Sequence, residues 1–156
     1  MINCQFESGN KASLRHVVVD CIIVKDNQIL LVKRVGKLLE GGKWALVGGF
    51  VESDETLEEC LVREIKEEAG YTVKDIKLFR IIDNPDRRNE DRQNISFVYL
   101  AWADKKIGEG DWETEGQKWF KLDNLPPKED IAFDHFDNIE LYKQHLKNPF
   151  LLPVIK

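Results

Sequence analysis

Residues 49–71 read GFVESDETLEECLVREIKEEAGY, a glycine-led turn followed by the pattern of an amphipathic helix. Acidic residues favour the first helical turn, and either Thr56 or Ser53 is placed to cap it. Gly70 stands where helices commonly end in a left-handed residue. The sequence therefore predicts one helix over residues 53–69.

The apolar and acidic residues of this helix share a face when the chain advances about 100° per residue. With Glu64 at zero, Glu68 falls near about 40° and Glu67 near about −60°. Three apolar side chains fall between about 20° and 100° and mark the face that the core should bury: Leu57, Leu61 and Ile65. The carboxylates of Glu64, Glu67 and Glu68 therefore lie on or beside the buried face, whereas Glu59 points away to solvent.

Carboxylates in this arrangement need a partner, because residues three and four positions apart are neighbours on a helix. Glu64, Glu67 and Glu68 crowd together and repel one another. Burying them uncompensated would cost roughly several kcal/mol per charge or force protonation. A hard divalent cation removes this cost, and carboxylate oxygens suit Mg²⁺ or Mn²⁺ better than zinc. We therefore expect a Mg²⁺ site, with Mn²⁺ as an alternative.

Strands and turns are expected on both sides of this helix. β-Branched and aromatic runs predict a hairpin and further strands, with a second helix near the end. Gly48-Gly49 is expected to break the pattern between two short strands. The expected segments are strands at 16–24, 29–32, 44–47, 50–51, 72–82, 94–103 and 118–122, and a helix at 136–146. Strands mixed with two helices indicate an α/β or α+β sandwich in a single domain, residues 1–156.

The helix and its preceding turn carry a known pattern. The sequence contains Gly49-x5-Glu55-x7-Arg63-Glu64-Ile65-x-Glu67-Glu68-x-Gly70-Tyr71. It resembles the Nudix box, G-x5-E-x7-R-E-U-x-E-E-x-G-U, where U is a bulky aliphatic residue. All seven fixed identities are present, a match expected by chance on the order of once in a million chains. Tyr71 departs from the last aliphatic position, and Val47 stands where many relatives have proline. Neither position supplies a ligand.

This resemblance implies a fold and a metal site. The fold would be a Nudix-like α/β/α sandwich with a mixed β-sheet and a catalytic helix. The metal ligands would be the carbonyl oxygen of Gly49 and the carboxylates of Glu64, Glu67 and Glu68. Arg63 and Glu55 would orient these carboxylates through hydrogen bonds.

The resemblance also implies a general base, which family members take either from the box or from a later loop. Glu115, which comes shortly before Trp119-Phe120, resembles the later glutamate. Glu113 and Glu64 are the alternatives. The acidic residues near position 115 are equally well explained as a solvated turn, since a base must reach the attacking water.

Four segments resemble ADP-ribose pyrophosphatase relatives: Gly49–Glu52, the loop with Pro85, Ile95–Ala101 and Ala132–His135. In the loop with Pro85, arginine suits phosphate or ribose oxygens, so Arg87, Arg88 and Arg92 are candidate substrate contacts. A solvated hairpin loop is the alternative. His135 is the histidine expected near the pocket.

Aromatic residues are candidates for stacking on a base, although aromatics in strands more often belong to a core. The four considered are Trp44, Phe50, Trp112 and Phe133, and Phe50 is the one we expect to contact substrate.

The composition limits which classes of binding partner and which cellular location we expect. The 156 residues carry a net charge of −5, which gives no basic field for a nucleic-acid polymer, so a small nucleotide is expected. The three cysteines form no CxxC pair, which argues against zinc or a disulfide framework. The N-terminus lacks a signal-peptide pattern, and no apolar run is long enough to span a membrane. We expect a cytoplasmic protein without a membrane partner.

Mg²⁺-dependent hydrolysis of the pyrophosphate bond in ADP-ribose or a similar nucleoside diphosphate derivative is the leading hypothesis. A house-cleaning (deoxy)nucleoside triphosphate pyrophosphatase is the runner-up, because the box does not distinguish the two. A non-catalytic nucleotide-sensing module is the third, although such a module would be expected to lose box carboxylates. Dimerisation is common among the resembled relatives, so a homodimer is a further expectation.

Overall fold

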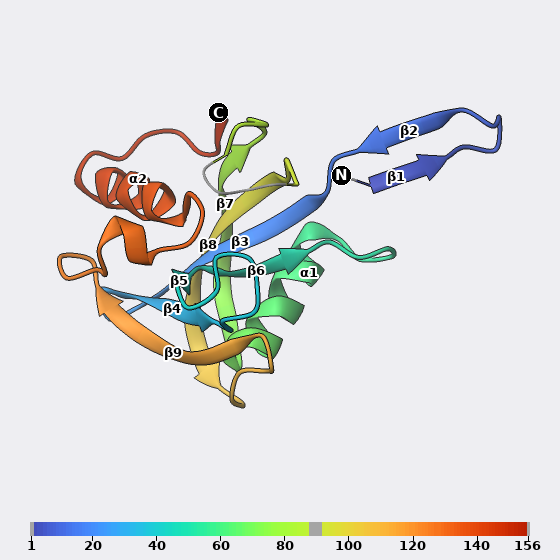
Figure 1. The fold of residues 1–156 in the computed structure, drawn as a ribbon. Coiled ribbons are helices and arrows are strands. Elements are labelled where there is room, and N and C mark those ends of the chain that lie inside the picture. The colour runs from blue at the N-terminus through green and yellow to red at the C-terminus, as the bar shows by residue number, and fades with distance from the viewer. Residues whose placement is uncertain (1, 88–91, 156) are drawn as a thin grey trace.

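The computed structural model describes residues 2–87 and 92–155. Their main element is an eight-stranded mixed sheet in the order β10-β7-β8-β3-β4-β5, with β6 paired to β3 and β9 paired to β4 (Figure 1). The strands are β1 Ile2–Gln5, β2 Lys11–Leu14, β3 Val17–Lys25, β4 Gln28–Arg34, β5 Trp44–Ala45, β6 Val47–Phe50, β7 Tyr71–Ile82, β8 Ile95–Lys106, β9 Thr114–Lys121 and β10 Val154–Ile155. The helices are α1 Leu57–Glu64, which continues as a π turn at Ile65–Ala69, a 3-10 turn at Lys128–Asp130, and α2 His135–Lys147.

Strand β3 lies in the middle of the sheet and is buried on both faces. Its sequence VVVDCIIVK is a near-continuous apolar run, which is typical of a strand covered from both sides. Val19, Cys21 and Ile23 pack in one core with residues of α1. The alternate residues Ile22 and Val24 pack in a second core with residues of α2. Helices therefore cover opposite faces of a mixed sheet, and the expected α/β/α sandwich is confirmed (Figure 1).

The sequence suggested that Gly48-Gly49 breaks a strand, but the pair lies inside β6. The interruption comes at Leu46, between β5 and β6. β6 pairs with β3 so closely that a Cβ atom on Gly48 would lie 2.0 Å from the carbonyl oxygen of Val19. Gly48 is therefore needed for the close approach of two backbones, which a sequence pattern of glycines does not distinguish from a turn.

The box helix is shorter than expected at its start. Asp54 has a φ of +68°, outside the helical region, and the helix begins at Leu57. Thr56, one of the two proposed caps, accepts a hydrogen bond from the backbone N–H of Glu59, while the Glu59 carboxylate accepts from the N–H of Thr56. This reciprocal pair is a capping box. Gly70 ends the segment in the left-handed region with a φ of 67°, as the sequence predicts.

Three strands escaped the sequence analysis. β1 and β2 form a separate two-stranded sheet that extends away from the main sheet (Figure 1). β10 adds two residues in parallel to the edge strand β7. None of the helices in the described part of the chain is long and apolar enough to cross a membrane.

Candidate active site

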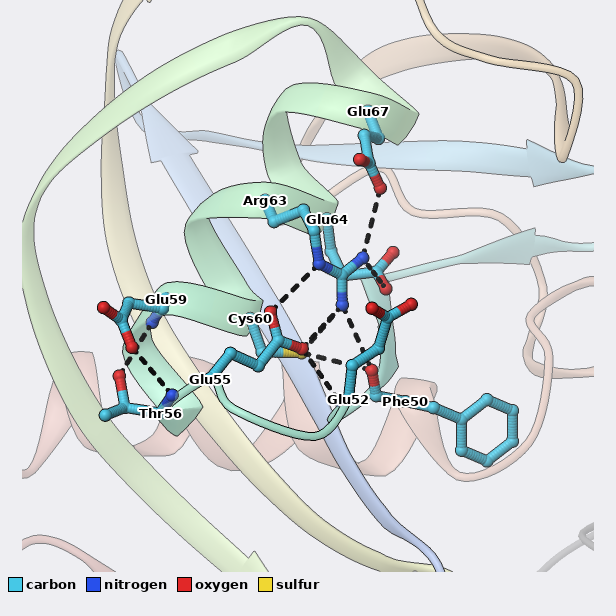
Figure 2. A network of polar contacts seen from close by, with 9 residues as sticks. All are labelled: Phe50, Glu52, Glu55, Thr56, Glu59, Cys60, Arg63, Glu64 and Glu67. Carbon is cyan, nitrogen blue, oxygen red and sulfur yellow. Dashed lines mark hydrogen bonds and ion pairs between the residues drawn. The ribbon is translucent and has the colours of Figure 1, made fainter.

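Arg63 is the centre of a polar network on α1 (Figure 2). Its guanidinium donates to both carboxylate oxygens of Glu55, at 3.0 and 2.8 Å. One further nitrogen donates to Glu64 at 2.8 Å and to Glu67 at 3.1 Å. The backbone carbonyl of Phe50 also accepts from Arg63, at 3.2 Å. The side chain thus connects three box carboxylates with the end of β6.

Glu55 is held from a second side as well. The backbone N–H of Glu52 donates to its carboxylate at 2.8 Å. Hydrogen bonds from Arg63, with a further one from Glu52, lower the pKa of Glu55 to about 2. Glu55 is therefore an anion across the physiological pH range, in the position from which it fixes the Arg63 guanidinium.

Glu68 is the most deeply buried carboxylate of the box, with 6% of its surface exposed. It accepts a hydrogen bond of 3.1 Å from the backbone N–H of Gly48. Burial, with the nearby charge of Glu64, raises the pKa of Glu68 to about 8 despite this bond. The charge of Arg34 opposes this rise but does not offset the burial, so a further positive charge would favour the ionised form.

Glu64 lies directly against the backbone of β6. A Cβ atom on Gly49 would be 2.2 Å from its carboxylate oxygen. Burial raises the pKa of Glu64, although Arg63 opposes this effect, and the charges of its acidic neighbours raise it further. Glu67 differs, because half of its side chain is exposed and its carboxylate is turned toward Arg63.

The box carboxylates do not form a complete set of metal ligands in this structure. Within residues 2–87 and 92–155, no three acidic, histidine or cysteine side chains come close enough together to hold a metal ion. The donor chemistry nevertheless fits a hard cation. Glu64 and Glu68 are carboxylates with raised pKa values, they lie beside the backbone of Gly49 and Gly48, and oxygen donors are what Mg²⁺ and Mn²⁺ prefer.

A pocket opens on the other side of β6. Gly48, Gly49 and Phe50 line it. Strand β6 therefore borders both the box carboxylates and the pocket.

Arginine and aromatic side chains make up much of the pocket wall. Phe50 is 41% exposed, with the Arg92 guanidinium 5.5 Å from its ring centroid. Phe133 and Arg34 form a second pair of this kind, in which the Arg34 guanidinium lies 5.2 Å from the Phe133 ring centroid. All four line the pocket. Arg88, a third predicted contact of the same loop, lies outside the described residues.

The other two aromatic candidates are not in the pocket lining. Trp44 packs edge-on against Phe120, with 5.0 Å between ring centroids, beside the core on the α2 face. Trp112 is 64% exposed on the segment between β8 and β9.

His135 forms part of the pocket floor. Its Nδ1 atom accepts a hydrogen bond of 2.9 Å from the backbone N–H of Leu46, so the proton of the neutral ring lies on Nε2. Nε2 faces the Asp20 carboxylate at 3.3 Å. Burial raises the pKa of Asp20, but its contacts with His135 and the charge of Arg87 outweigh burial and bring it to about 2. Asp20 is thus an ionised acceptor at the pocket floor.

Arg87 also lines the pocket, but its guanidinium is engaged. Two of its nitrogens donate to the two carboxylate oxygens of Asp134, at 2.9 and 2.6 Å. This bidentate pair joins the loop after β7 to the residue that precedes α2, and it leaves less of the arginine to meet a phosphate.

Of the candidate bases outside the box, Glu113 directly precedes β9 and Glu115 lies within it. Glu115 is exposed, and its carboxylate accepts a hydrogen bond of 3.0 Å from the backbone N–H of Gly36. The charge of Glu113 acts on both Glu64 and Arg34. Of the two, Glu113 therefore has the carboxylate with the stronger influence on the box.

Two charged pocket residues were missed by the sequence analysis. Arg34 ends β4, and its side chain donates to the carbonyl of Leu39 at 2.9 Å. Burial lowers the pKa of Arg34, and the charges of Glu68 and Glu113 oppose this change, which places the guanidinium near the box carboxylates. Asp20 is the other. A single charged residue within the apolar run of β3 was the available signal.

The comparisons with known proteins agree with the fold and with the family that the box indicates. The family model of the NUDIX domain matches residues 14–142. An ADP-ribose pyrophosphatase of Methanocaldococcus jannaschii is 43% identical over 129 residues, which cover 81% of this chain and 72% of that protein. An NAD-capped RNA hydrolase of Vibrio vulnificus is 37% identical over 117 residues, or 70% of this chain, and the chain spans 41% of its length.

A solved structure extends the likeness to nearly the whole chain. The crystal structure of a NUDIX hydrolase from Nitrosomonas europaea aligns with a TM-score of 0.78 at 26% identity, over 99% of this chain and 93% of that one. Hydrolases of this family generally use divalent metal ions. The family model, the box and the fold lead to one conclusion: the chain belongs to the Nudix hydrolase family.

Proposed function

We propose that this chain hydrolyses the pyrophosphate bond of ADP-ribose or a similar nucleoside diphosphate derivative, with Mg²⁺ or Mn²⁺ as the metal. The observation that carries the proposal is the position of β6. Gly48 contacts Glu68 and Gly49 contacts Glu64, while both glycines line the pocket. A nucleoside in the pocket would therefore present its diphosphate to the box carboxylates. The similarity to an ADP-ribose pyrophosphatase supports the substrate.

The metal would be held by Glu64, Glu68 and the Gly49 carbonyl oxygen. Glu67 would exchange its hydrogen bond to Arg63 for the metal. When bound, the cation offsets negative charge on the diphosphate and lowers the pKa of the attacking water. Arg63 and Glu55 act through other residues, because they keep the carboxylates oriented.

Pocket residues would hold the nucleoside and its phosphates. Phe50 and Phe133 offer ring faces to a base, and Asp20 and His135 offer polar groups at the floor. Arg34, which lies near both the pocket and the box, is suited to a phosphate oxygen. Arg92 is a second candidate for such a contact, and Arg87 would act mainly by fixing the loop beside α2.

For the base, we propose Glu115 with Glu113 and Glu64 as alternatives. The sequence resemblance supports Glu115, whereas charge effects on Glu64 favour Glu113. Glu115→Gln and Glu113→Gln distinguish them, since loss of the base removes the acidic limb of the pH profile of kcat. If a variant keeps this limb, the glutamate replaced in that variant is not the base.

The runner-up activity is pyrophosphate release from a (deoxy)nucleoside triphosphate, and the third reading is nucleotide sensing without turnover. Retention of all box carboxylates favours the two enzymes. A homodimer, a cytoplasmic location and the absence of a nucleic-acid polymer as partner stay predictions from the sequence.

The deciding experiment measures products from a nucleotide panel with Mg²⁺ and with EDTA. The panel contains ADP-ribose, NADH, nucleotide sugars, diadenosine polyphosphates and the (deoxy)nucleoside triphosphates. We expect AMP and ribose 5-phosphate from ADP-ribose, and loss of turnover in a folded Glu68→Gln variant. Pyrophosphate from a triphosphate alone would support the runner-up, and binding without any turnover would support sensing. Wild-type turnover in Glu68→Gln would contradict the metal assignment.

A further inference from the structure

Trp112 is an aromatic side chain with no place in the pocket or in a core. It is 64% exposed, and the Lys37 ammonium lies 5.2 Å from its ring centroid. An isolated exposed apolar residue needs no explanation by itself. The position of Trp112 does need an explanation, because Trp112 and Lys37 lie on two loops that meet at the active site.

The loop that bears Lys37 borders the pocket. At its start, the backbone N–H of Val35 donates to the carbonyl of Glu113 at 3.0 Å, and the N–H of Gly36 donates to the Glu115 carboxylate. Further along, Leu39 lines the pocket together with Arg34. One loop thus contacts the pocket and, through backbone hydrogen bonds, the segment that carries Trp112.

The segment that bears Trp112 lies against the box helix. The hydroxyl of Thr114 donates to the backbone carbonyl of Glu68 at 3.5 Å. A Cβ atom on Gly110 would lie 2.4 Å from the same carbonyl oxygen. Trp112 falls between these two contacts in the chain. The segment that carries Trp112 therefore packs against the backbone of Glu68, a residue whose carboxylate belongs to the box.

A diphosphate bound at the box has two substituents, and the pocket accommodates one of them. We propose that Trp112 and Lys37 form a second subsite, which takes the other substituent when it carries an aromatic base. The inference rests on the proposed function. Among the nucleoside diphosphate derivatives of the proposed function, it adds to ADP-ribose the class of dinucleotides joined through a diphosphate.

Stacking provides the physical reason. A base presents a flat π-face to the indole ring, and such stacking contributes about 1–3 kcal/mol per base in other proteins. The ammonium of Lys37 adds a positive charge for a phosphate or for the electron-rich faces of both rings. A terminal ribose has no π-face, so ADP-ribose gains nothing from Trp112.

The test compares ADP-ribose with NADH, which share the adenosine diphosphate half and one ribose and differ in the nicotinamide base. For Trp112→Ala we expect kcat/KM on NADH to fall at least about fivefold, the lower limit of the stacking contribution. The value on ADP-ribose should stay within about twofold. Trp112→Phe, which keeps an aromatic face, should restore most of the loss.

The chain offers a matched control at Trp102, which also has a lysine, Lys77, 5.6 Å from its ring centroid. This pair lies outside both the pocket lining and the Trp112 segment. Lys77→Ala should leave the ratio of the two substrates unchanged, whereas Lys37→Ala should lower it. Equal losses on both substrates in Trp112→Ala, or no loss on either, would overturn the inference.

A binding measurement separates this inference from the proposed function. Dissociation constants for NADH and ADP-ribose are measured by calorimetry in EDTA, where hydrolysis does not occur. Tighter binding of NADH that is lost in Trp112→Ala supports the second subsite even if no substrate is turned over. No turnover of any nucleotide would contradict the proposed function alone. Identical binding of both ligands in the wild type and the variant would contradict the second subsite alone.

Discussion

His135 accepts a hydrogen bond of 2.9 Å at Nδ1 from the backbone N–H of Leu46, while its Nε2 faces Asp20 at 3.3 Å. The first bond joins the start of α2 to the residue between β5 and β6. The second fixes an ionised carboxylate at the pocket floor. One buried side chain therefore connects the packing of a helix with the shape of the candidate binding site.

His135→Ala should lower both stability and substrate affinity. The N–H of Leu46 would be left buried without an acceptor, which costs about 1–3 kcal/mol and lowers Tm by about 2–4 °C per kcal/mol in a chain of this size. KM should rise more than kcat falls, because the pocket floor loses order. Thermal unfolding and steady-state kinetics measure the two effects.

His145 supplies the control for this prediction. It too accepts a hydrogen bond from a backbone N–H, that of Phe150 at 3.3 Å, but it is not part of the pocket lining. His145→Ala should cost stability and leave KM unchanged. An unchanged KM in His135→Ala would mean that the histidine serves the fold alone.

The two glycines of β6 should respond differently to alanine. A Cβ atom at Gly48 would meet the backbone of Val19 at 2.0 Å, whereas one at Gly49 would meet the carboxylate of Glu64 at 2.2 Å. Backbone cannot move away cheaply, so Gly48→Ala should cost about 1–3 kcal/mol or more. The Glu64 side chain can rotate, so Gly49→Ala should retain most stability and lose most activity. Urea unfolding and turnover of the same samples would show this contrast. Equal unfolding midpoints for Gly48→Ala and Gly49→Ala would argue against it.

These glycines also show why the sequence predicted the fold better than the site. The box helix, its Thr56 cap and the left-handed Gly70 follow from local rules of helix formation, and the structure contains each of them. Whether a glycine pair turns or passes another strand depends on partners distant in the chain. Local patterns carry no information about such partners.

The pocket was the least predictable part for the same reason. Arg34 and Asp20 come from two central strands, and only the sheet pairing brings them beside residues of α2 and of the loop after β7. Arg87 was considered as a phosphate contact, and its bidentate pairing with Asp134 depends on a residue 47 positions away. The short β1 and β2 strands lack a long alternating pattern, so they too escaped notice.

Glu55→Gln should reduce activity without unfolding the helix. The carboxamide would place its N–H donors against the N–H donors of Arg63, which now meet two carboxylate oxygens. Loss of such an orienting partner typically costs 10–100-fold, roughly, in metal affinity or activity. We expect a higher Mg²⁺ concentration at half-maximal activity, measured by metal titration.

Glu59→Gln is the matched control on the same helix. Its carboxylate serves the capping box with Thr56, a role that glutamine also fills. Metal dependence should therefore be that of the wild type. Equal changes in metal dependence in the two variants would remove the special role assigned to Glu55.

The metal-free protein should lose stability as pH rises. The pKa of Glu68 is about 8 in the folded chain because of its burial, against 4.5 for an unperturbed glutamate side chain. Below about pH 4.5 both folded and unfolded states hold this proton, so Glu68 contributes no pH dependence there. Between about pH 4.5 and 8 the unfolded state releases the proton first. Folding is therefore disfavoured progressively, by a total of about 5 kcal/mol once pH exceeds about 8.

Differential scanning calorimetry in EDTA would measure this loss as a fall of Tm between pH 5 and pH 8. Glu68→Gln, which cannot ionise, should show a flatter profile and a higher Tm at pH 8 than the metal-free wild type. Mg²⁺ should raise the wild-type Tm more at pH 8 than at pH 5, because the cation and the proton compete for one carboxylate. It should raise the Tm of the variant little at either pH. A stabilisation by Mg²⁺ that is independent of pH, or equal in the variant, would place the metal away from Glu68.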